Sequence, residues 1–264
     1  MFNIAKIKMC KRGYIFMKKI FLVQTVNGEV KHDFVFHLLR ACEYHNWLYG
    51  EEVYEVIKKD KINNVDDNKV GRIVPVGGLD FVFKYMDKVL NLKGNREPIN
   101  IPNSLFKEEY LKRFCEKNKY KEDLDFSGGL LFVKSESAYK KYTDIVKDKR
   151  NLEDDKYFIS EVVEIESEWR VFVFKELLEM KMVGLRNYIG DFKIFPDINL
   201  LEDMISDYVE SPSAYTMDVG ISRDRGTFLL EIHPFVSCGL YGFDNYKILP
   251  MMFVRGFNFL RRTS

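Results

Sequence analysis

The sequence predicts a mixed fold, α/β in its first third and α+β with a large antiparallel component in the rest. Strand-like and helix-like segments alternate between about residues 18 and 92, and short strand-like segments dominate from about residue 129 onwards. Alternation is typical of a small parallel sheet, whereas runs of short strands are typical of antiparallel pairing. Hydrophobic residues make up 46% of the 264 residues, which argues for a substantial core and against disorder.

The N-terminal part predicts a small α/β domain over residues 17–95, preceded by an extension over 1–16 with Met17 as an alternative start. Periodicity and residue type place strands and helices in alternation, with a polar surface loop at 59–69. The predicted elements are strands over 18–23, 52–59 and 71–76, and helices over 34–47 and 79–90.

The remainder, residues 96–264, predicts a second domain whose two subdomains are hinged near 160–166. It opens with a helix over 105–117 that Asn103 or Ser104 would cap. The other predicted elements are strands over 129–134, 157–163, 168–174, 181–188, 214–221 and 227–233, and helices over 200–209 and within 244–260.

The overall charge and the cysteines exclude several classes of function. The net charge is +1, from 41 basic and 40 acidic side chains, so the field of the whole protein favours neither nucleic acid nor a membrane surface. The four cysteines have no zinc-ligand or redox spacing, and no apolar stretch is long enough to span a bilayer. We expect a cytoplasmic protein without nucleic-acid or membrane partners, and a homodimer is compatible with these observations.

The segment from Tyr215 to His233 predicts a hairpin that brings two acids together. A register that keeps both apolar rows on one face places Asp218 opposite Glu231. Like charges at matched positions of a hairpin repel, so they need a cation or exposure to water. Two carboxylates suit Mg²⁺ bound together with phosphates, and a solvated hairpin face is the alternative. On the apolar face this register pairs Ile221 with Phe228 and Val219 with Leu230, and it places Thr216 opposite His233.

Six segments, taken in order, resemble the ATP-grasp superfamily, and especially its stand-alone domain proteins of bacteria and phages. They are VPVGGLDFVFKYM, INIPNSLFKEEYLKRF, LLFVKSESAYKKYTDIV, YFISEVVEIESEWRVFVF, the predicted hairpin and PFVSCGLYGFD. The resemblance implies an ATP-grasp fold behind a small pre-ATP-grasp domain.

For the nucleotide, the resemblance implies a set of phosphate-binding lysines and an adenine-reading linker. Lys134 and Lys140 match the two lysines, with Lys141 as an alternative to Lys140. Glu166 would accept the ribose hydroxyls, with Glu164 as its alternative. The linker whose backbone would read the adenine edge consists of Glu161, Val162 and Val163.

Two arginines are expected to act on the transferring phosphoryl group. Arg170 alternates onto the same strand face as Phe172 and Phe174, where its burial would require an anion. A phosphate or acyl-phosphate oxygen fits, and a structural salt bridge to a glutamate is the alternative. Arg186 resembles a further anion-contacting arginine of the family.

For the metal, Asp218 and Glu231 match the metal-binding acids of the superfamily, and His233 stands where asparagine is usual. His233 would be a third ligand or a neighbour that supports the acids, with Mg²⁺ as the metal and Mn²⁺ as the alternative. The implied function is an ADP-forming ligase that joins a small-molecule or peptide carboxylate to an amine (or a thiol), with peptide or amino-acid ligation as the default. The alternative is a non-catalytic or regulatory nucleotide-binding protein, which His233, Ser135 and Asp144 favour because they replace the family's usual residues.

Overall fold

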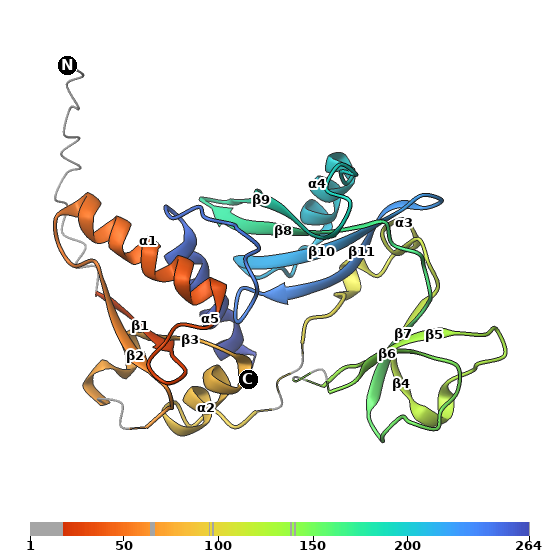
Figure 1. Cartoon of the computed structure of the whole chain (residues 1–264), viewed down its shortest axis with the longest axis horizontal. Coiled ribbons are helices and arrows are strands. Elements are labelled where there is room, and N and C mark those ends of the chain that lie inside the picture. Colours follow the sequence, from red (N-terminus) through yellow and green to blue (C-terminus); the bar gives the residue numbers. More distant parts are fainter. Residues whose placement is uncertain are drawn as a thin grey trace, which may run out of the picture.

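The computed structural model describes residues 18–63, 67–94, 96, 98–137, 139 and 141–263. The predicted extension over 1–16 and Lys140 therefore lie outside the described residues. The described residues form three sheets, and the sheet built from β4, β5, β6 and β7 lies to one side of the other two (Figure 1). The predicted mixed class is confirmed, and no helix among the described residues is long and apolar enough to cross a membrane.

The first sheet is parallel, as predicted, and has the strand order β2-β1-β3. Its central strand runs IFLV with all four side chains buried, which is typical of a parallel strand covered on both faces. Helix α1 ends at Gly50, whose left-handed φ of 68° favours glycine. The elements are β1 (Lys19–Gln24), α1 (Asp33–Tyr49), β2 (Tyr54–Lys59), the 3₁₀ helix η1 (Asp67–Arg72), β3 (Ile73–Val76) and α2 (Leu79–Lys88).

The second sheet is antiparallel, with the order β4-β7-β5-β6. The predicted helix over 105–117 is wrong. Only a 3₁₀ helix, η2 (Asn103–Leu105), and one turn, α3 (Glu108–Leu111), form, and Lys107 stands at the N-cap of that turn. Lys112 then adopts a left-handed φ of 47°, and the following residues pair with β7, so tertiary pairing overrides the local helical pattern. The strands are β4 (Cys115–Tyr120), β5 (Leu131–Ser135), β6 (Thr143–Val146) and β7 (Lys156–Glu161), with the 3₁₀ helix η3 (Lys121–Asp123) between β4 and β5.

The third sheet is antiparallel and has the order β11-β10-β8-β9. The Asp197 side chain caps α4 by accepting from the Asn199 and Leu200 amides, at 3.0 and 3.3 Å. The elements are β8 (Ser167–Glu176), β9 (Glu179–Gly190), α4 (Ile198–Asp207), β10 (Ala214–Ser222), β11 (Gly226–Pro234) and α5 (Leu249–Arg262).

The β10–β11 hairpin confirms half of the predicted register and corrects the other half. Asp218 lies opposite Glu231 and Thr216 opposite His233, but a β-bulge follows Asp218. Beyond it Val219 pairs with Leu229 rather than Leu230, and Ile221 pairs with Thr227 rather than Phe228. The extra residue places the neighbours Leu230 and Glu231 on the same side, where both line a cavity.

One hydrophobic core runs through the first sheet, its helices, α5 and part of the third sheet. Gly256 permits this packing, because a Cβ there would lie 2.2 Å from the Phe235 carbonyl oxygen. The C-terminal helix is thus covered by the N-terminal part of the chain. The predicted domain division at 95/96 stays a prediction, since this core includes residues from both sides of it.

Candidate functional site

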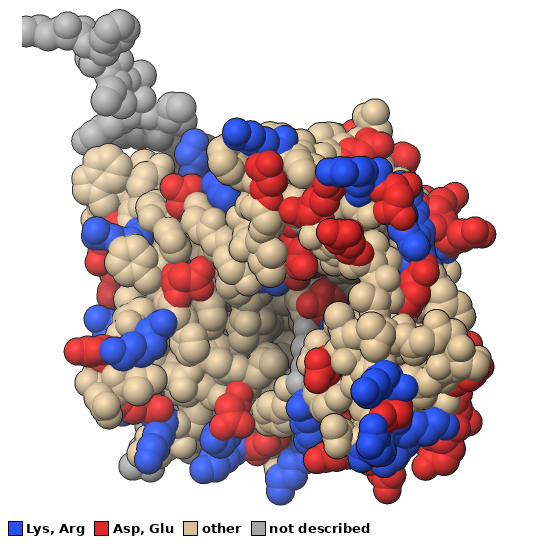
Figure 2. Space-filling model, turned by 45° about the vertical axis from the view of Figure 1, so that its right-hand side comes forward, with Lys and Arg blue, Asp and Glu red and all other residues tan. Residues whose placement is uncertain are grey.

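A cavity of about 350 Å³, which we call the hinge cavity, lies between the second and third sheets. Figure 2 shows the surface hollowed in the middle of one face of the molecule. Both sheets contribute apolar and charged side chains to its lining, a composition typical of small-molecule sites. Its lining includes Arg113, Phe132, Lys134, Thr143, Ile145, Phe158, Glu161, Val162, Val163, Glu168, Tyr188, Asp218, Phe228, Leu230 and Glu231.

Most of the nucleotide and metal residues predicted from the sequence meet at this cavity. Lys134 comes from β5, Glu161 to Val163 from the end of β7, and Asp218 and Glu231 from the hairpin. Glu166, predicted to bind ribose, pairs instead with Arg223 at 3.2 Å, and the cavity wall carries Glu168 in its place. The ribose role of Glu166 therefore stays a prediction.

Arg170 and Asp218 form a buried bidentate ion pair across β8 and β10. Arg170 Nε and Nη2 each donate to one Asp218 carboxylate oxygen, at 2.7 Å, and the side chains are 8% and 3% exposed. Burial by itself raises the pKa of Asp218, but hydrogen bonds from Arg170 and His233 outweigh it and hold that pKa below its ordinary value. The anion that meets Arg170 here is this aspartate, whereas the sequence favoured a phosphate, with a glutamate as the alternative.

Aromatic rings and a carbonyl fix the guanidinium group of Arg170. Its Nη1 donates to the Gly239 carbonyl at 2.9 Å, and its Cζ lies 5.0 Å from the ring centroid of Tyr241. Tyr241 in turn stacks on Tyr188 at 4.8 Å. Arg170 thus connects Asp218, which the sequence predicts as a metal ligand, to the loop that follows β11.

Glu231 lies in a second polar cluster, which crosses between two sheets. The Lys134 ammonium group, on β5, donates to Glu231 Oε2, and His233 Nε2 lies 2.8 Å from Glu231 Oε1. At that distance the imidazole donates its Nε2 proton to the carboxylate. The Lys134–Glu231 ion pair therefore closes the second sheet onto the third.

Asp218, Glu231 and His233 have the chemistry of a divalent-cation site. One ligand atom from each lies within 4.8 Å of the others. The two carboxylates fit a hard cation such as Mg²⁺. His233 Nε2 already donates to Glu231, so ligation through that atom would require this hydrogen bond to break. The geometry suits His233 better to orienting Glu231 than to binding the ion itself.

Glu168 and Tyr188 are polar residues that the sequence reasoning missed. The Tyr188 hydroxyl donates to Glu168 Oε2 at 2.7 Å. Burial raises the pKa of Glu168, and the charges of Asp218 and Glu231 raise it further. The signal was strand alternation, since Glu168 is two residues before Arg170 and Tyr188 two after Arg186, on the faces that carry the arginines.

Arg186 lies directly across from Arg170, in β9. Its side chain is 37% exposed, and its Nη2 lies 3.7 Å from the carboxylate of Asp244. Cys238, on the same loop as Asp244, is buried, and burial raises the pKa of its thiol to about 12. A thiol with that pKa is protonated at neutral pH and is not a nucleophile.

A second cavity of about 330 Å³, the loop cavity, lies on the other side of Glu231. Among the described residues, Glu231 is the one that lines both the hinge cavity and the loop cavity. The loop that bounds it is held by Asp33, whose Oδ2 accepts from the Leu240 and Tyr241 amides at 2.7 and 3.2 Å. The lining includes Phe83, Arg96, Pro98, Arg170, His233, Ser237, Cys238, Gly239 and Tyr241.

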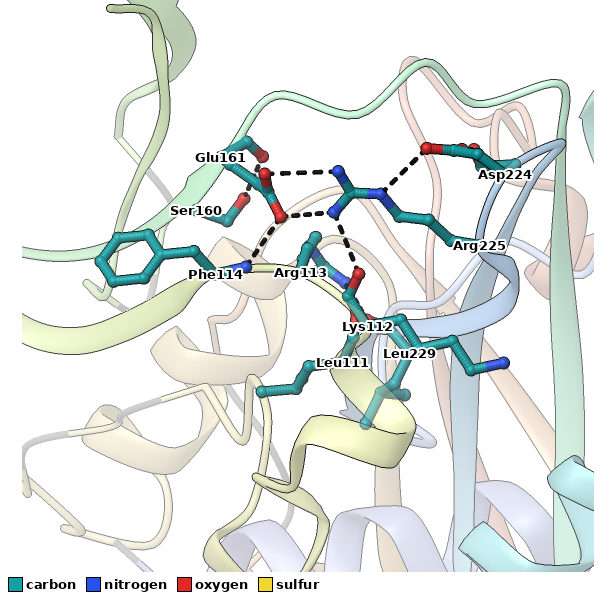
Figure 3. A network of polar contacts seen from close by, with 10 residues as sticks. Leu111, Lys112, Arg113, Phe114, Ser160, Glu161, Asp224, Arg225 and Leu229 are labelled. Atoms are coloured by element: carbon teal, nitrogen blue, oxygen red, sulfur yellow. Dashed lines mark hydrogen bonds and ion pairs between the residues drawn. The ribbon is translucent and has the colours of Figure 1, made fainter. Parts of the chain in front are cut away.

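The chain passes between the second and third sheets at residues 111–114 and again after Glu161. One network of hydrogen bonds and ion pairs joins these two segments (Figure 3). Arg225, in the β10–β11 turn, pairs with the Glu161 carboxylate and donates to the Lys112 carbonyl at 3.0 Å. The same carboxylate accepts from the Phe114 amide at 2.9 Å. Beside it, Arg113 Nη1 donates to the Leu229 carbonyl at 2.7 Å. The Glu161 side chain thus ties the end of β7 to the β10–β11 turn and to residues 112–114, and the same residue lines the cavity.

We expect Arg225→Ala to loosen the hinge without unfolding the protein. Partly exposed pairs contribute about 0.2–1 kcal/mol, so amide exchange at residues 112–114 and 161–165 should rise by up to about fivefold. Hydrogen-exchange mass spectrometry measures this directly. Arg223→Ala is the matched control, because that side chain is 90% exposed. Equal exchange in the two variants would contradict a hinge role for Arg225.

Comparisons with known proteins identify the fold around this site. Residues 118–251 match the model of a family described as an ATP-grasp domain, family 2 of its clade. The search among curated proteins found no relative of similar sequence. Solved structures with the same fold include N5-carboxyaminoimidazole synthetase from Staphylococcus aureus complexed with ADP, with a TM-score of 0.55 and 11% identity over 89% of this chain and 77% of that one.

Two further solved structures cover nearly the whole of both chains. D-alanine–D-alanine ligase from Bacillus anthracis, complexed with ATP, has a TM-score of 0.51 and 13% identity over 93% of this chain and 98% of that one. A RimK domain ATP-grasp protein from Sphaerobacter thermophilus has a TM-score of 0.52 and 11% identity over 92% and 99%. At these identities the likeness concerns the fold, and it confirms the predicted ATP-grasp fold.

Proposed function

Because the chain belongs to this ATP-grasp domain family, we propose that it is an ATP- and Mg²⁺-dependent ligase that joins a carboxylate to an amine and releases ADP and phosphate. The solved structures of the same fold include ligases and synthetases, and those from Staphylococcus aureus and Bacillus anthracis named above hold ADP and ATP. Fold alone does not fix function, so the proposal rests on the site.

The observation that carries the proposal is the position of Glu231 between two cavities. On one side lies the hinge cavity, with a lysine and apolar walls, and on the other lies the loop cavity, with Arg170 and His233. A phosphoryl group that passes between two substrates must do so at the point where their sites meet. The hinge cavity is the nucleotide side of this junction, and the loop cavity is the side of the carboxylate.

On the nucleotide side, the chain offers apolar surface for a base and cations for phosphates. Phe132, Ile145 and Phe228 supply apolar walls, and the backbone of Val162 and Val163 supplies polar edges for adenine. Lys134 is the described lysine of this cavity, and it reaches the phosphates by leaving Glu231. Release of Glu231 then makes its carboxylate available for the ion.

Asp218 and Glu231 would hold Mg²⁺, with His233 keeping Glu231 oriented. When bound, the ion neutralises charge on the phosphates. Arg170 fixes Asp218 through both carboxylate oxygens, so Asp218 is already oriented before ligands enter. Arg170 lines the loop cavity and Arg186 lies across from it in the neighbouring strand, so the two guanidinium groups would attract the anionic acyl phosphate.

These positions support a reaction in two steps. A carboxylate oxygen in the loop cavity attacks the γ-phosphorus, the bond from that phosphorus to the β-phosphate oxygen breaks, and ADP leaves. An amine nitrogen then bonds to the acyl carbon, the bond from carbon to the phosphate oxygen breaks, and phosphate and a proton are released. The protein contributes position and charge neutralisation and forms no covalent bond.

The proposal predicts Mg²⁺-dependent release of ADP and phosphate that rises when both a carboxylate and an amine are supplied. Coupled assays of ADP and of phosphate measure it across panels of each substrate. ATP turnover to AMP and pyrophosphate would overturn the acyl-phosphate reaction.

A non-catalytic nucleotide-binding protein is the second candidate, and the Arg170–Asp218 pair favours it. Both Asp218 oxygens are already hydrogen-bonded to a buried guanidinium group, which weakens the attraction of this acid for a metal ion. This alternative predicts ATP binding that is independent of Mg²⁺ and no ADP release with any substrate pair.

A further inference from the structure

Helix α1 carries large aromatic side chains on a face that the rest of the described chain leaves exposed. Phe36 is 49% exposed and Trp47 is 74% exposed, and Figure 1 shows the helix at the periphery, away from the second sheet. A surface helix normally has one apolar stripe, which faces the core, and α1 already buries its other face. The side chains buried on that inner face are Phe34, Val35, Leu38, Ala41 and Cys42. A second apolar face on the same helix is typical of a protein–protein contact.

Four residues on this face form what we call the outer stripe, which is complementary to its own reverse. They are Phe36, Arg40, Glu43 and Trp47, at spacings of four, three and four residues. These spacings keep the four side chains on one narrow face of a helix. Read in either direction, the outer stripe has an aromatic ring, two opposite charges and a second aromatic ring.

Among the described residues, the ring contacts and ion pairs of the outer stripe join it to other residues of α1. Arg40 Nη1 donates to Glu43 Oε2 at 3.2 Å, and Arg40 Cζ lies 5.7 Å from the Phe36 ring centroid. The Trp47 ring lies 6.2 Å from the ring of Tyr44. The Arg40 and Glu43 side chains are 57% and 68% exposed. Because an exposed pair of this kind is weak, exchanging it for an equivalent pair across an interface costs little.

We propose that the outer stripe is the contact surface of a homodimer, in which α1 packs antiparallel against α1 of a second copy. A two-fold axis between Arg40 and Glu43 places each of these charges beside its opposite in the other copy. The same axis places Phe36 of each copy against Trp47 of the other. An interface with two-fold symmetry must be complementary to itself, and the outer stripe meets this condition. Parallel packing would bring like charges together, which is unfavourable.

The composition and size of the outer stripe indicate a dimer of moderate affinity. Tryptophan and arginine are among the residues that most often carry the energy of an interface, and the outer stripe has one of each. A single helix face is at the small end of specific interfaces. We therefore expect a dissociation constant of about 1–100 µM.

The same helix supports the loop between β11 and α5, which bounds the loop cavity. Asp33, at the start of α1, accepts from two amides of this loop. His45 Nε2 donates to the carbonyls of Tyr246 and Lys247, at 3.0 and 3.1 Å. A dimer formed through α1 would therefore join the two copies through the helix that holds this loop in each of them. The dimer needs neither ATP nor Mg²⁺, so this proposal does not depend on the proposed function.

Sedimentation equilibrium of the full chain, at about 1–200 µM protein, measures the proposed dimer directly. The wild type should pass from monomer to dimer over this range, and Trp47→Ala should raise the dissociation constant by at least about tenfold. Leu178→Ala is the matched control, because Leu178 is 89% exposed in the β8–β9 turn. A wild type that stays monomeric would overturn the proposal and leave the outer stripe to a different partner. An equal dissociation constant in Trp47→Ala would place the interface elsewhere and also overturn it.

Charge exchange tests the antiparallel pairing, with circular dichroism to verify that each variant is folded. Arg40→Glu and Glu43→Arg should each raise the dissociation constant by at least about tenfold, because two ion pairs become two repulsions. The double variant should dimerise like the wild type. An equimolar mixture of the two single variants should form heterodimers, since every charge again faces its opposite.

Arg150→Glu is the control for a change of charge alone, because the Arg150 side chain is 79% exposed and lies outside α1. Its dissociation constant should match that of the wild type. Single variants that dimerise as tightly as the wild type, or a mixture of them that stays monomeric, would overturn the pairing of Arg40 with Glu43 and with it the proposed surface.

Discussion

Replacing Arg170 with methionine is expected to lower the free energy of unfolding by about 3–5 kcal/mol, because it leaves a charged carboxylate buried without its partner. The Asp218 side chain is 3% exposed, and Arg170 donates to both of its oxygens. The change also removes the hydrogen bond to the Gly239 carbonyl, so the loop cavity should lose its boundary. The rate of ADP release by this variant should therefore be lower than that of the wild-type protein.

Urea denaturation at neutral pH measures this loss. Arg186→Met is the matched control, since Arg186 lies opposite Arg170 in β9 but its side chain is 37% exposed. Its replacement should change the free energy of unfolding by no more than about 0.5 kcal/mol. Similar effects of both changes would show that the Arg170–Asp218 pair does not hold the site together.

Glu231→Gln is expected to reduce the rate of ADP release by about 10²–10³-fold, the scale of losing one preorganised electrostatic contact. The glutamine keeps the shape of the side chain but removes the charge that would meet the ion and that Lys134 contacts in the absence of nucleotide. ATP affinity should consequently lose its dependence on Mg²⁺. Equilibrium binding of ATP, with and without Mg²⁺, checks this beside steady-state kinetics.

Glu179→Gln provides the control for that experiment, because the Glu179 side chain is 77% exposed and lines neither the hinge cavity nor the loop cavity. It should leave both turnover and the Mg²⁺ dependence unchanged. Retained Mg²⁺ dependence in Glu231→Gln would contradict the metal assignment, whatever the rate.

Local patterns were enough to predict the parallel sheet and the acids of the hairpin. The run IFLV and the alternation of Tyr215 to Ile221 each depend on residues close in sequence, and Asp218 does lie opposite Glu231. The bulge after Asp218 was not predictable in this way. It depends on which side chains the rest of the fold buries, and period-two alternation assumes that no residue is extra.

Features that depend on distant pairing were missed for the same reason. The segment after Lys112 has a helical pattern, but its pairing with β7 decides its conformation. Arg223 meets Glu166 and Arg225 meets Glu161 across 57 and 64 residues of sequence, and Glu168 rather than Glu166 lines the hinge cavity.

The central claim is that a carboxylate is phosphorylated at the junction marked by Glu231. Supplying the carboxylate substrate with ¹⁸O in both oxygens and analysing the phosphate by mass spectrometry tests it directly. We predict that one ¹⁸O atom appears in each phosphate released, in step with ADP. Phosphate without ¹⁸O, or label found in AMP, would contradict the account.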